Sequence, residues 1–466
     1  MSNETTIASA DGAPVFTGAE AQPSETSTSY NVQALPEEFY TAFLSDMAKA
    51  RKPSPIRGLF PLEKKPGVLS LLAGKPSGSM FPFTSVTFGT RDPSDPAREY
   101  KLDVAPDLLG QGLQYGGTDG IPPAVEWLTM LQETEHKRSR DEGWRVSVTA
   151  GSQDAIYKAV TSMVNPGDAI FVEKPVYAGV IPMFQSLHCE MIEIETDSNG
   201  IISSSLRKIL ESWPADKPKP KILYTVPYGC NPTGMTASLE RRLEVLALAR
   251  EHNFIIFEDD PYYYLYFGTA PRIPSYFTLE ARTGPDVGRV LRFDSFSKIL
   301  SAGVRLGFAT GPAPLLKAMD SHTASANLQA SSFVQAIIVT LLHSWGYEGF
   351  KKHTENVSAF YRARRDVFEN AMRRHLDGLA EWETPQAGMF FWFKLLLGQG
   401  ENDDSQELVR TKAYENGVLA LPGTVFLPNG ARTAYVRASF SLLEEHDVDE
   451  ALRRLGETIR KERGGA

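Results

Sequence analysis

The chain has 466 residues, of which 42% are hydrophobic and 23% are charged, so it is long enough to bury a large core and to form two folded lobes. Its 57 Asp and Glu outnumber its 48 Lys and Arg, and the resulting net charge of −9 argues against a nucleic-acid-binding surface. No run reaches the roughly 18–20 apolar residues of a membrane-spanning helix. The only cysteines, Cys189 and Cys230, are too few for a disulfide scaffold or a four-thiolate metal site and suit a reducing compartment.

The N-terminal segment, residues 1–34, contains no Lys or Arg and no apolar h-region. The pattern therefore predicts neither a secretory nor a mitochondrial presequence, and we expect the protein in the cytoplasm. Because the segment offers little apolar surface, we expect a disordered tail. From Leu35 onward, Phe39, Phe43 and Met47 recur at helical spacing until Pro53, which predicts a short helical arm.

Strand-like and helix-like patterns alternate along the middle of the chain. The expected strands cover residues 145–149, 169–172, 221–226, 254–257 and 290–294, and the expected helices cover 153–164, 180–187 and 239–251. Buried strands that alternate with amphipathic helices are typical of a mostly parallel sheet with crossover helices. The middle of the chain is therefore predicted to be α/β.

Beyond about residue 310 the pattern becomes that of a smaller α+β lobe. It comprises long helical patterns at 332–344 and 347–376, short strands at 388–395, 418–420 and 434–439, and a closing helix near 447–463. We therefore expect a disordered tail (1–34), an N-terminal arm that joins the small domain (35–90), a large cofactor-binding domain (91–328) and a small C-terminal domain (329–466).

A lysine follows the expected strand at 290–294. Lys298 lies among small hydroxyl residues and seven residues before Arg305. In this arrangement Lys298 could form a Schiff base, while Ser295, Ser297 and Arg305 hold a phosphate dianion. A polar loop that contains a solvated lysine would have the same composition.

Acidic and aromatic residues follow the strand at 254–257. Asp260 could keep a pyridine nitrogen protonated, and Tyr263, three residues on, could bind an oxygen of the same ring. Taken alone, the segment would fit a Mg²⁺ site or a solvated loop better.

Two further strand ends carry polar residues. Asn231 begins the sequence Asn-Pro-Thr-Gly, which alone predicts only a turn. Ser152 follows Gly151 at the start of a helix, where free amides favour an anion, although an ordinary helix cap would also explain it. Because the carboxyl ends of parallel strands meet at one edge of a sheet, we expect Asn231, Asp260 and Lys298 to converge.

These motifs occur in the order typical of one enzyme family. From about Lys52 to Phe440 the chain resembles the class I fold-type I pyridoxal 5′-phosphate (PLP) aminotransferases, in the branch of fungal aromatic amino acid and mammalian kynurenine/2-aminoadipate aminotransferases. The segments that carry the resemblance are 52–57, 81–83, 114–115, 151–153, 231–234, 259–263, 295–298, 388–390 and 437–440. The resemblance implies an α/β fold, with a large domain around a mostly parallel seven-stranded sheet and a smaller α+β domain.

The resemblance also implies roles at the cofactor. Lys298 would form the Schiff base and move the proton, Asp260 would pair with the pyridinium nitrogen, and Tyr263 and Asn231 would donate to the ring oxygen. Tyr177 would stack on the ring, although a packed structural tyrosine is an alternative. The residues implied at the phosphate are Ser152, Gln153, Ser295, Ser297, Arg305 and, from the neighbouring subunit, Tyr115.

Substrate contacts are implied at a second group of positions. Arg437 would bind the α-carboxylate through two hydrogen bonds, Gly74 and Asn231 would border the substrate, and Arg57 would allow either an aromatic or an acidic side chain. The chain departs from its relatives at Cys230, where Gln or His is common. It also departs at position 75, where a lysine replaces an apolar residue.

The function implied is that of a cytoplasmic, homodimeric PLP-dependent aminotransferase with a ping-pong mechanism. The expected donors are phenylalanine, tyrosine, tryptophan, kynurenine or 2-aminoadipate, and the expected acceptor is 2-oxoglutarate. No metal, nucleic-acid or membrane partner is expected. The alternatives are a PLP-dependent lyase and a non-catalytic PLP-binding sensor, for which residues 1–34 are too short and acidic to supply a DNA-binding domain.

Overall fold

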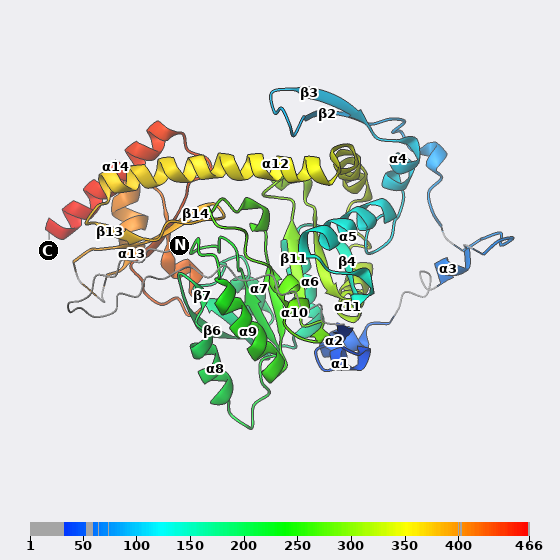
Figure 1. The fold of residues 1–466 in the computed structure, drawn as a ribbon, viewed down its shortest axis with the longest axis horizontal. Coiled ribbons are helices and arrows are strands. Elements are labelled where there is room, and N and C mark those ends of the chain that lie inside the picture. The colour runs from blue at the N-terminus through cyan, green and yellow to red at the C-terminus, as the bar shows by residue number, and fades with distance from the viewer. Residues whose placement is uncertain are drawn as a thin grey trace, which may run out of the picture.

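The computed structural model describes residues 32–52, 59–63, 65–72, 74–398, 400 and 403–464. Its central feature is an eight-stranded sheet (Figure 1). In their spatial order, the strands are β4 (Trp144–Thr149), β12 (Gly307–Pro312), β11 (Val290–Ser295), β9 (Ile255–Asp259), β8 (Ile222–Thr225), β5 (Ala169–Lys174), β6 (Glu190–Asp197) and β7 (Gly200–Ile201).

Most neighbouring strands of this sheet are parallel. β11, β9, β8, β5 and β6 run in one direction, whereas β12 is antiparallel to both β11 and β4. The α/β class, the mostly parallel sheet and all five strands expected from the sequence are confirmed. The two-residue strand β7, antiparallel to β6, extends the expected seven strands to eight.

The central strands are rich in apolar residues, although β9 and β11 also contain buried charged residues. Every residue of β8, β9 and β11 is buried. Phe257 of β9 and Phe293 of β11 contact each other with their ring centroids 5.4 Å apart. Such continuous burial is typical of a parallel sheet that is covered on both faces.

Helices connect the strands as the sequence pattern predicts. α9 (Leu239–His252) begins after Ser238, whose hydroxyl accepts the N–H of Arg241 (3.3 Å), and is followed by Asn253 in the left-handed conformation (φ 54°). The other helices of this part are α4 (Pro106–Leu113), α5 (Pro122–His136), α6 (Ser152–Met163), α7 (Ile181–Ser186), α8 (Ser203–Glu211), α10 (Tyr276–Arg282) and α11 (Ala313–Ala326).

One long helical element, α12 (Ser332–His375), leads to a second, smaller core. Figure 1 shows that α12 crosses the molecule from the region of α5 toward α14. The two helical patterns expected at 332–344 and 347–376 are confirmed, since Gly346 interrupts α12 with non-helical torsions (φ 62°, ψ −173°). The second core includes the buried side chains of Phe368, Phe391 and Val436.

The second sheet is antiparallel throughout. It consists of β13 (Ala380–Trp382), β14 (Phe390–Leu395), β16 (Tyr435–Ser439) and β15 (Leu421–Pro422), with α13 (Ser405–Leu408) and α14 (Glu445–Gly464) beside it. The strand expected at 418–420 is wrong. The N–H of Val418 instead bonds to the carbonyl of Ala413 (2.8 Å) and closes the end of a helix at Gly417.

The N-terminal segment packs on the body that holds the large sheet. β1 (Gln33–Ala34) pairs with β10 (Asp286–Val287), and the expected arm contains two short helices, α1 (Glu37–Thr41) and α2 (Asp46–Ala50). They are separate because Ser45 begins a new helix by accepting the N–H of Ala48 (3.1 Å). Residues 1–31 of the expected tail lie outside the described residues.

The elements that follow are α3 (Phe60–Glu63) and the hairpin of β2 (Thr87–Arg91) and β3 (Glu99–Asp103).

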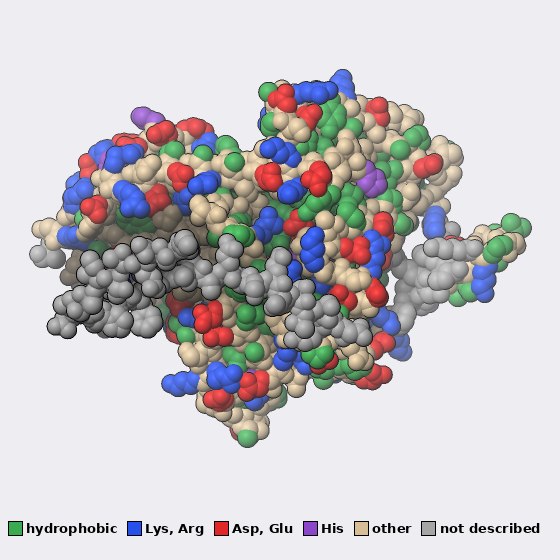
Figure 2. Space-filling model, in the orientation of Figure 1, with side chains coloured by type: hydrophobic (Ala, Val, Ile, Leu, Met, Phe, Trp, Pro, Cys, Tyr) green, Lys and Arg blue, Asp and Glu red, His purple; other side chains and the backbone are tan. Residues whose placement is uncertain are grey.

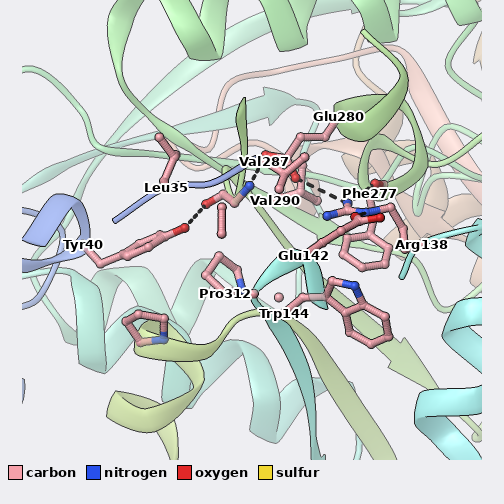
Figure 3. Close-up of a pocket in the computed structure, with 15 residues that line it drawn as sticks. Leu35, Tyr40, Arg138, Glu142, Trp144, Phe277, Glu280, Val287, Val290 and Pro312 are labelled. Atoms are coloured by element: carbon pink, nitrogen blue, oxygen red, sulfur yellow. Dashed lines mark hydrogen bonds and ion pairs between the residues drawn. The ribbon is translucent and has the colours of Figure 1, made fainter. Parts of the chain in front are cut away.

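A small cavity of about 20 Å³ lies where the N-terminal segment meets the body (Figure 3). Tyr40 points toward Gly288 and donates its hydroxyl to the Gly288 carbonyl (3.0 Å), while Glu280 accepts the Gly288 N–H (2.7 Å). The volume suits about one water molecule. Tyr40 is 2% exposed and thus anchors α1 to the main core.

The visible surface is of mixed charge. On the face shown in Figure 2, basic and acidic side chains are interspersed over the described residues. None of the described helices is both long and apolar enough to cross a membrane. Within the same residues, no group of three or more His, Cys, Asp or Glu side chains is placed to hold a metal ion.

We expect Phe257→Ala to lower the free energy of unfolding by about 3–5 kcal/mol, because a fully buried ring is replaced by a cavity. Phe360→Ala is the matched control: this ring is 51% exposed, so the change should stay within about 0.5 kcal/mol. Urea unfolding followed by circular dichroism measures both values. Equal losses for the two variants would contradict the placement of Phe257 in the core.

Candidate active site

The turn after β11 carries Lys298, whose side chain is partly buried. Burial lowers the pKa of Lys298; Arg305 and Arg437 lower it further, and Asp259 acts in the opposite direction. A lowered pKa increases the share of the neutral amine, which is the form that acts as a nucleophile or a base. The charges that act on Lys298 therefore come from the large sheet, the turn after β11 and the second sheet.

The N-terminus of α6 and the side chain of Arg305 form a candidate phosphate site. α6 begins at Ser152, directly after Gly151, whose φ of 96° provides a turn that side chains disfavour. One guanidinium nitrogen of Arg305 donates to the Ser297 hydroxyl (3.2 Å). The free amides and positive end of the helix, together with the guanidinium, favour a dianion.

Close backbone packing holds this candidate phosphate site together. A side chain at Gly307 would begin 2.8 Å from the Ser152 nitrogen, and one at Gly151 would begin 2.6 Å from a guanidinium nitrogen of Arg305. The Gln153 side chain donates to the carbonyl of Gly179 (2.8 Å). The backbone N–H of Gln153, rather than its side chain, therefore remains for a phosphate. The strand end also brings the Ser295 hydroxyl close to this turn, where it accepts the N–H of Ser297 (3.2 Å).

The structure corrects the expectation for Asp260. Glu258 and Asp260 both lie beside Arg292, at 3.4 and 2.8 Å, so they share one face of the sheet. Successive side chains of a strand point to opposite faces, which directs Asp259 away from Arg292. Asp259 is also the carboxylate that acts on Lys298. Asp259, and not Asp260, therefore belongs to the lysine site.

The same one-residue shift applies to Tyr263. The guanidinium groups of Arg272 and Arg292 lie over the Tyr263 ring, at 4.4 and 4.6 Å from its centroid, away from the lysine site. Burial raises the pKa of Tyr262, and the charges that influence it include those of Tyr177, Asp259 and Arg437. Tyr262, three residues after Asp259, is thus the tyrosine that the structure brings to the site.

Arg437 and Asn231 meet beside Lys298. Arg437 of β16 donates to the side-chain oxygen of Asn231 (2.8 Å), and its guanidinium lies 4.2 Å from the Phe390 ring centroid. Burial raises the pKa of Tyr177, and Asp259 and Arg437 are the charges that influence it. The structure therefore brings Tyr177, Asn231 and Arg437 to the surroundings of Lys298, as the sequence predicts.

Cys230 directly precedes Asn231 and is buried. Its thiol donates to Glu173 (3.6 Å), which also accepts the hydroxyl of Thr225 (2.6 Å) and the N–H of Val226 (3.1 Å). Burial raises the pKa of Glu173. The thiol thus occupies a buried structural position beside Glu173.

Of the predicted residues that the structure describes, two are not brought to the site within this chain. Tyr115 is 56% exposed. Gly74 is exposed, and no described atom lies within 4 Å of the position where its side chain would begin. Arg57 lies outside the described residues.

The buried groups of the site fit a protonated pyridine ring with a phosphate. Asp259 is 3% exposed, and its hydrogen bond comes from the neutral hydroxyl of Tyr224 (2.5 Å). Its second oxygen has no hydrogen-bond partner among the described residues. Burial raises the pKa of this carboxyl to about 7. A buried carboxylate is stabilised by a cation, which a pyridinium nitrogen would supply, whereas Asp260 already has Arg292.

Sequence reasoning missed Asp259, Tyr262 and Tyr224. A signal for the first was present, because strand alternation separates Asp259 from Glu258 and Asp260. Tyr224 lies inside the apolar strand β8 and carried no signal of its own, since an aromatic residue is common in a buried strand.

Comparison with known proteins gives a consistent result. Residues 98–455 match the family described as aminotransferase class I and II. The aminotransferase tdiD of Emericella nidulans is 42% identical over 416 residues, which are 89% of this chain and 94% of that protein. The mitochondrial kynurenine/alpha-aminoadipate aminotransferase of Mus musculus is 40% identical over 437 residues, which are 91% and 99% of the two chains.

A solved structure shares the fold. The crystal structure of aminotransferase Aro8 from Candida albicans matches with a TM-score of 0.85 and 28% sequence identity, and the match covers 93% of this chain and 100% of that chain. The chain belongs to the aminotransferase class I and II family. It is a PLP-dependent aminotransferase, so the family, the type of enzyme and the cofactor expected from the sequence are confirmed.

We expect Arg305→Gln to raise the pKa of Lys298, because the variant loses a positive charge that disfavours the ammonium form. The pH dependence of Lys298 acetylation in cofactor-free protein, followed by mass spectrometry, measures this change. The midpoint should move to higher pH. Arg364→Gln is the control, since Arg364 pairs with Glu444 and does not act on Lys298. A midpoint that moves to lower pH, or equally in both variants, would refute the assigned charge effect.

Proposed function

We propose that this aminotransferase transfers the amino group of aromatic amino acids, kynurenine or 2-aminoadipate to 2-oxoglutarate by a ping-pong mechanism. The observation that carries the proposal is the convergence of three groups: Lys298, an amine of lowered pKa; Asp259, a buried carboxylate with one oxygen unpartnered among the described residues; and the guanidinium of Arg437. When bound, PLP supplies an electron sink for the negative charge that develops at the substrate Cα.

The chain's own residues position the reacting groups and move the proton. The Lys298 amine takes the proton from the substrate Cα and later returns it, and its lowered pKa favours the neutral amine that this transfer requires. Asp259 would hold the proton on the pyridine nitrogen when the cofactor is bound. Tyr262 and Asn231 would donate to the ring oxygen, and Tyr177 would stack on the ring.

The phosphate is held where α6 begins. Ser152, the amide of Gln153, Ser295, Ser297 and Arg305 supply donors there, and the helix end adds a favourable field. Tyr115 completes this site from a second copy of the chain in a homodimer. Its exposed position, on the chain as described, is compatible with such a contact.

Arg437 binds the α-carboxylate of the substrate through its planar guanidinium. Its buried Nε has no hydrogen-bond partner among the described residues and is therefore available to a carboxylate. The rings of Phe390 and Phe426 lie 4.2 and 5.2 Å from the guanidinium, so they offer an apolar surface beside it. Gly74, which this chain does not bring to its own site, would border the substrate pocket, and Arg57 would allow either an aromatic or an acidic side chain.

The proposed donors kynurenine and 2-aminoadipate follow the name of the mouse relative, which includes both. Its name also includes a mitochondrial location, whereas we propose the cytoplasm for this chain. Both cysteines are free and buried, which suits a reducing compartment. We retain residues 35–90 as the arm, 91–328 as the large domain and 329–466 as the small domain.

The substrate assignment predicts a half-reaction that needs no oxo acid. Holoenzyme mixed separately with phenylalanine, tyrosine, tryptophan, kynurenine and 2-aminoadipate should convert the bound cofactor to its amine form, seen as a change in its visible absorbance. Lys298→Ala should not turn over. Conversion with 2-aminoadipate alone would refute the aromatic donors, and no conversion with any donor would refute the proposed substrate class.

The assignment of the carboxylates predicts different outcomes for two neighbouring variants. Asp259→Asn should slow the half-reaction by about 10²–10³-fold, the usual effect of losing one well-placed electrostatic partner in an active site. Asp260→Asn should retain the half-reaction in the folded protein but lower the free energy of unfolding by about 3–5 kcal/mol, because Arg292 loses a buried partner. Stopped-flow absorbance and urea unfolding measure the two effects. The reverse pattern would restore Asp260 as the partner of the ring.

A further inference from the structure

A second cavity lies apart from the lysine site. It has a volume of about 390 Å³ and lies between the end of α5, the segment Tyr264–Gly268 and the part of α12 that follows Gly346. None of its lining residues is among those whose charges act on Lys298. Small-molecule sites usually have volumes of about 300–1,000 Å³. A cavity of about 150 Å³ is enough for one benzene ring, so this one has room for a ring and a short polar arm.

Aromatic side chains form much of the cavity wall. Tyr264, Tyr266, Phe267 and Tyr347 line it, and they come from two separate elements of the chain. Tyr264 is held in place by two contacts. Its ring contacts Phe350 with centroids 5.2 Å apart, and its carbonyl accepts the Ser358 hydroxyl (2.7 Å). A ring held by such walls gains favourable edge-to-face and stacked contacts.

The charges of the cavity favour an anion. Glu135 is already engaged, since it pairs with Arg272 (3.1 Å) and accepts the Tyr347 hydroxyl (2.7 Å). Lys351 and Arg362 also line the cavity from α12, and they form no ion pair with any part of the chain that the structure describes.

Glu355 is the remaining carboxylate of the wall, so the cations outnumber the carboxylates here although the whole chain carries a net charge of −9. A locally positive, partly enclosed surface raises the local concentration of small anions. The cavity therefore combines apolar walls with two cations that an anionic group could neutralise.

We propose that this cavity binds a small aromatic carboxylate at a site separate from the catalytic one. The ring lies among Tyr264, Tyr266, Phe267 and Tyr347, and the carboxylate faces Lys351 and Arg362 from the open side. Binding here joins α12 to the segment that follows Tyr262. The ligand class has a ring and an acid group but needs neither an amino nor an oxo group, because no reacting residue faces it.

The test uses the holoenzyme and 4-fluorophenylacetate, which lacks a transferable group, with binding followed by calorimetry and fluorine NMR. Wild-type protein should bind two equivalents per chain, one beside Arg437 and one in the cavity. Arg437→Ala should lose the first. Lys351→Ala/Arg362→Ala should lose the second, and Ala359→Trp, which fills the cavity from α12, should also lose it.

Lys352→Ala is the matched control, because Lys352 is the exposed neighbour of Lys351 but does not line the cavity. It should keep both equivalents. The proposal fails if the double variant and Ala359→Trp keep both equivalents, or if the wild type binds a single equivalent that Arg437→Ala abolishes. Trifluoroacetate, which has a carboxylate but no ring, should not displace the cavity-bound probe at equal concentration. Displacement of the probe by trifluoroacetate would show that the cavity does not recognise the ring.

Discussion

One buried guanidinium fixes the strands on which the active site is built. Arg292 has no exposed surface and lies 2.8 Å from Asp260, 2.7 Å from Asp294 and 3.4 Å from Glu258. Two of these carboxylates come from the end of β9 and the third from β11, so the charges join neighbouring strands. Removing one partner from such a cluster leaves an uncompensated buried charge, which typically costs about 3–5 kcal/mol.

The register that this cluster favours also determines what lies on the opposite face. Arg292 and Asp294 of β11 share a face with Glu258 and Asp260, because side chains two positions apart in a strand point the same way. The intervening residue Asp259, which pairs with Phe293 in the ladder, must point the other way. Ser295 follows Phe293 on that second face, just before the turn with Lys298. The ion-pair cluster around Arg292 on one face of the sheet thus places Asp259 and Ser295 on the opposite face.

The parts of the fold that the sequence could predict are those with a clear periodic pattern. β9 and β11 begin with apolar residues, and α12 has long helical periodicity interrupted at Gly346. β12 could not be predicted in the same way, since two glycines and a proline disfavour a strand. Its Gly307 is explained only in three dimensions, where a side chain would begin 2.7 Å from the Asp294 carbonyl.

The site shows the same division between local pattern and register. Lys298, Asn231 and Arg437 could be identified because each stands in a distinctive motif. In the segment 259–263, an acidic residue is followed by a tyrosine three positions later in two ways. Asp259 precedes Tyr262 by three residues, and Asp260 precedes Tyr263 by three residues. The choice between them depends on which carboxylate faces Arg292. That information resides in the pairing of β9 with β11 rather than in the segment itself.

Three consecutive tyrosines then enter three different environments. Tyr262 joins Asp259 and Tyr177 in the active site, Tyr263 lies under the guanidinium groups of Arg292 and Arg272, and Tyr264 lines the second cavity. Because Arg272 also lines that cavity, Tyr263 contacts both the buried cluster and the cavity wall. The three tyrosines are consecutive and buried, so a shift of one tyrosine requires its neighbours to repack. The backbone turn after β9 therefore links the geometry of the catalytic face to that of the cavity beside α12.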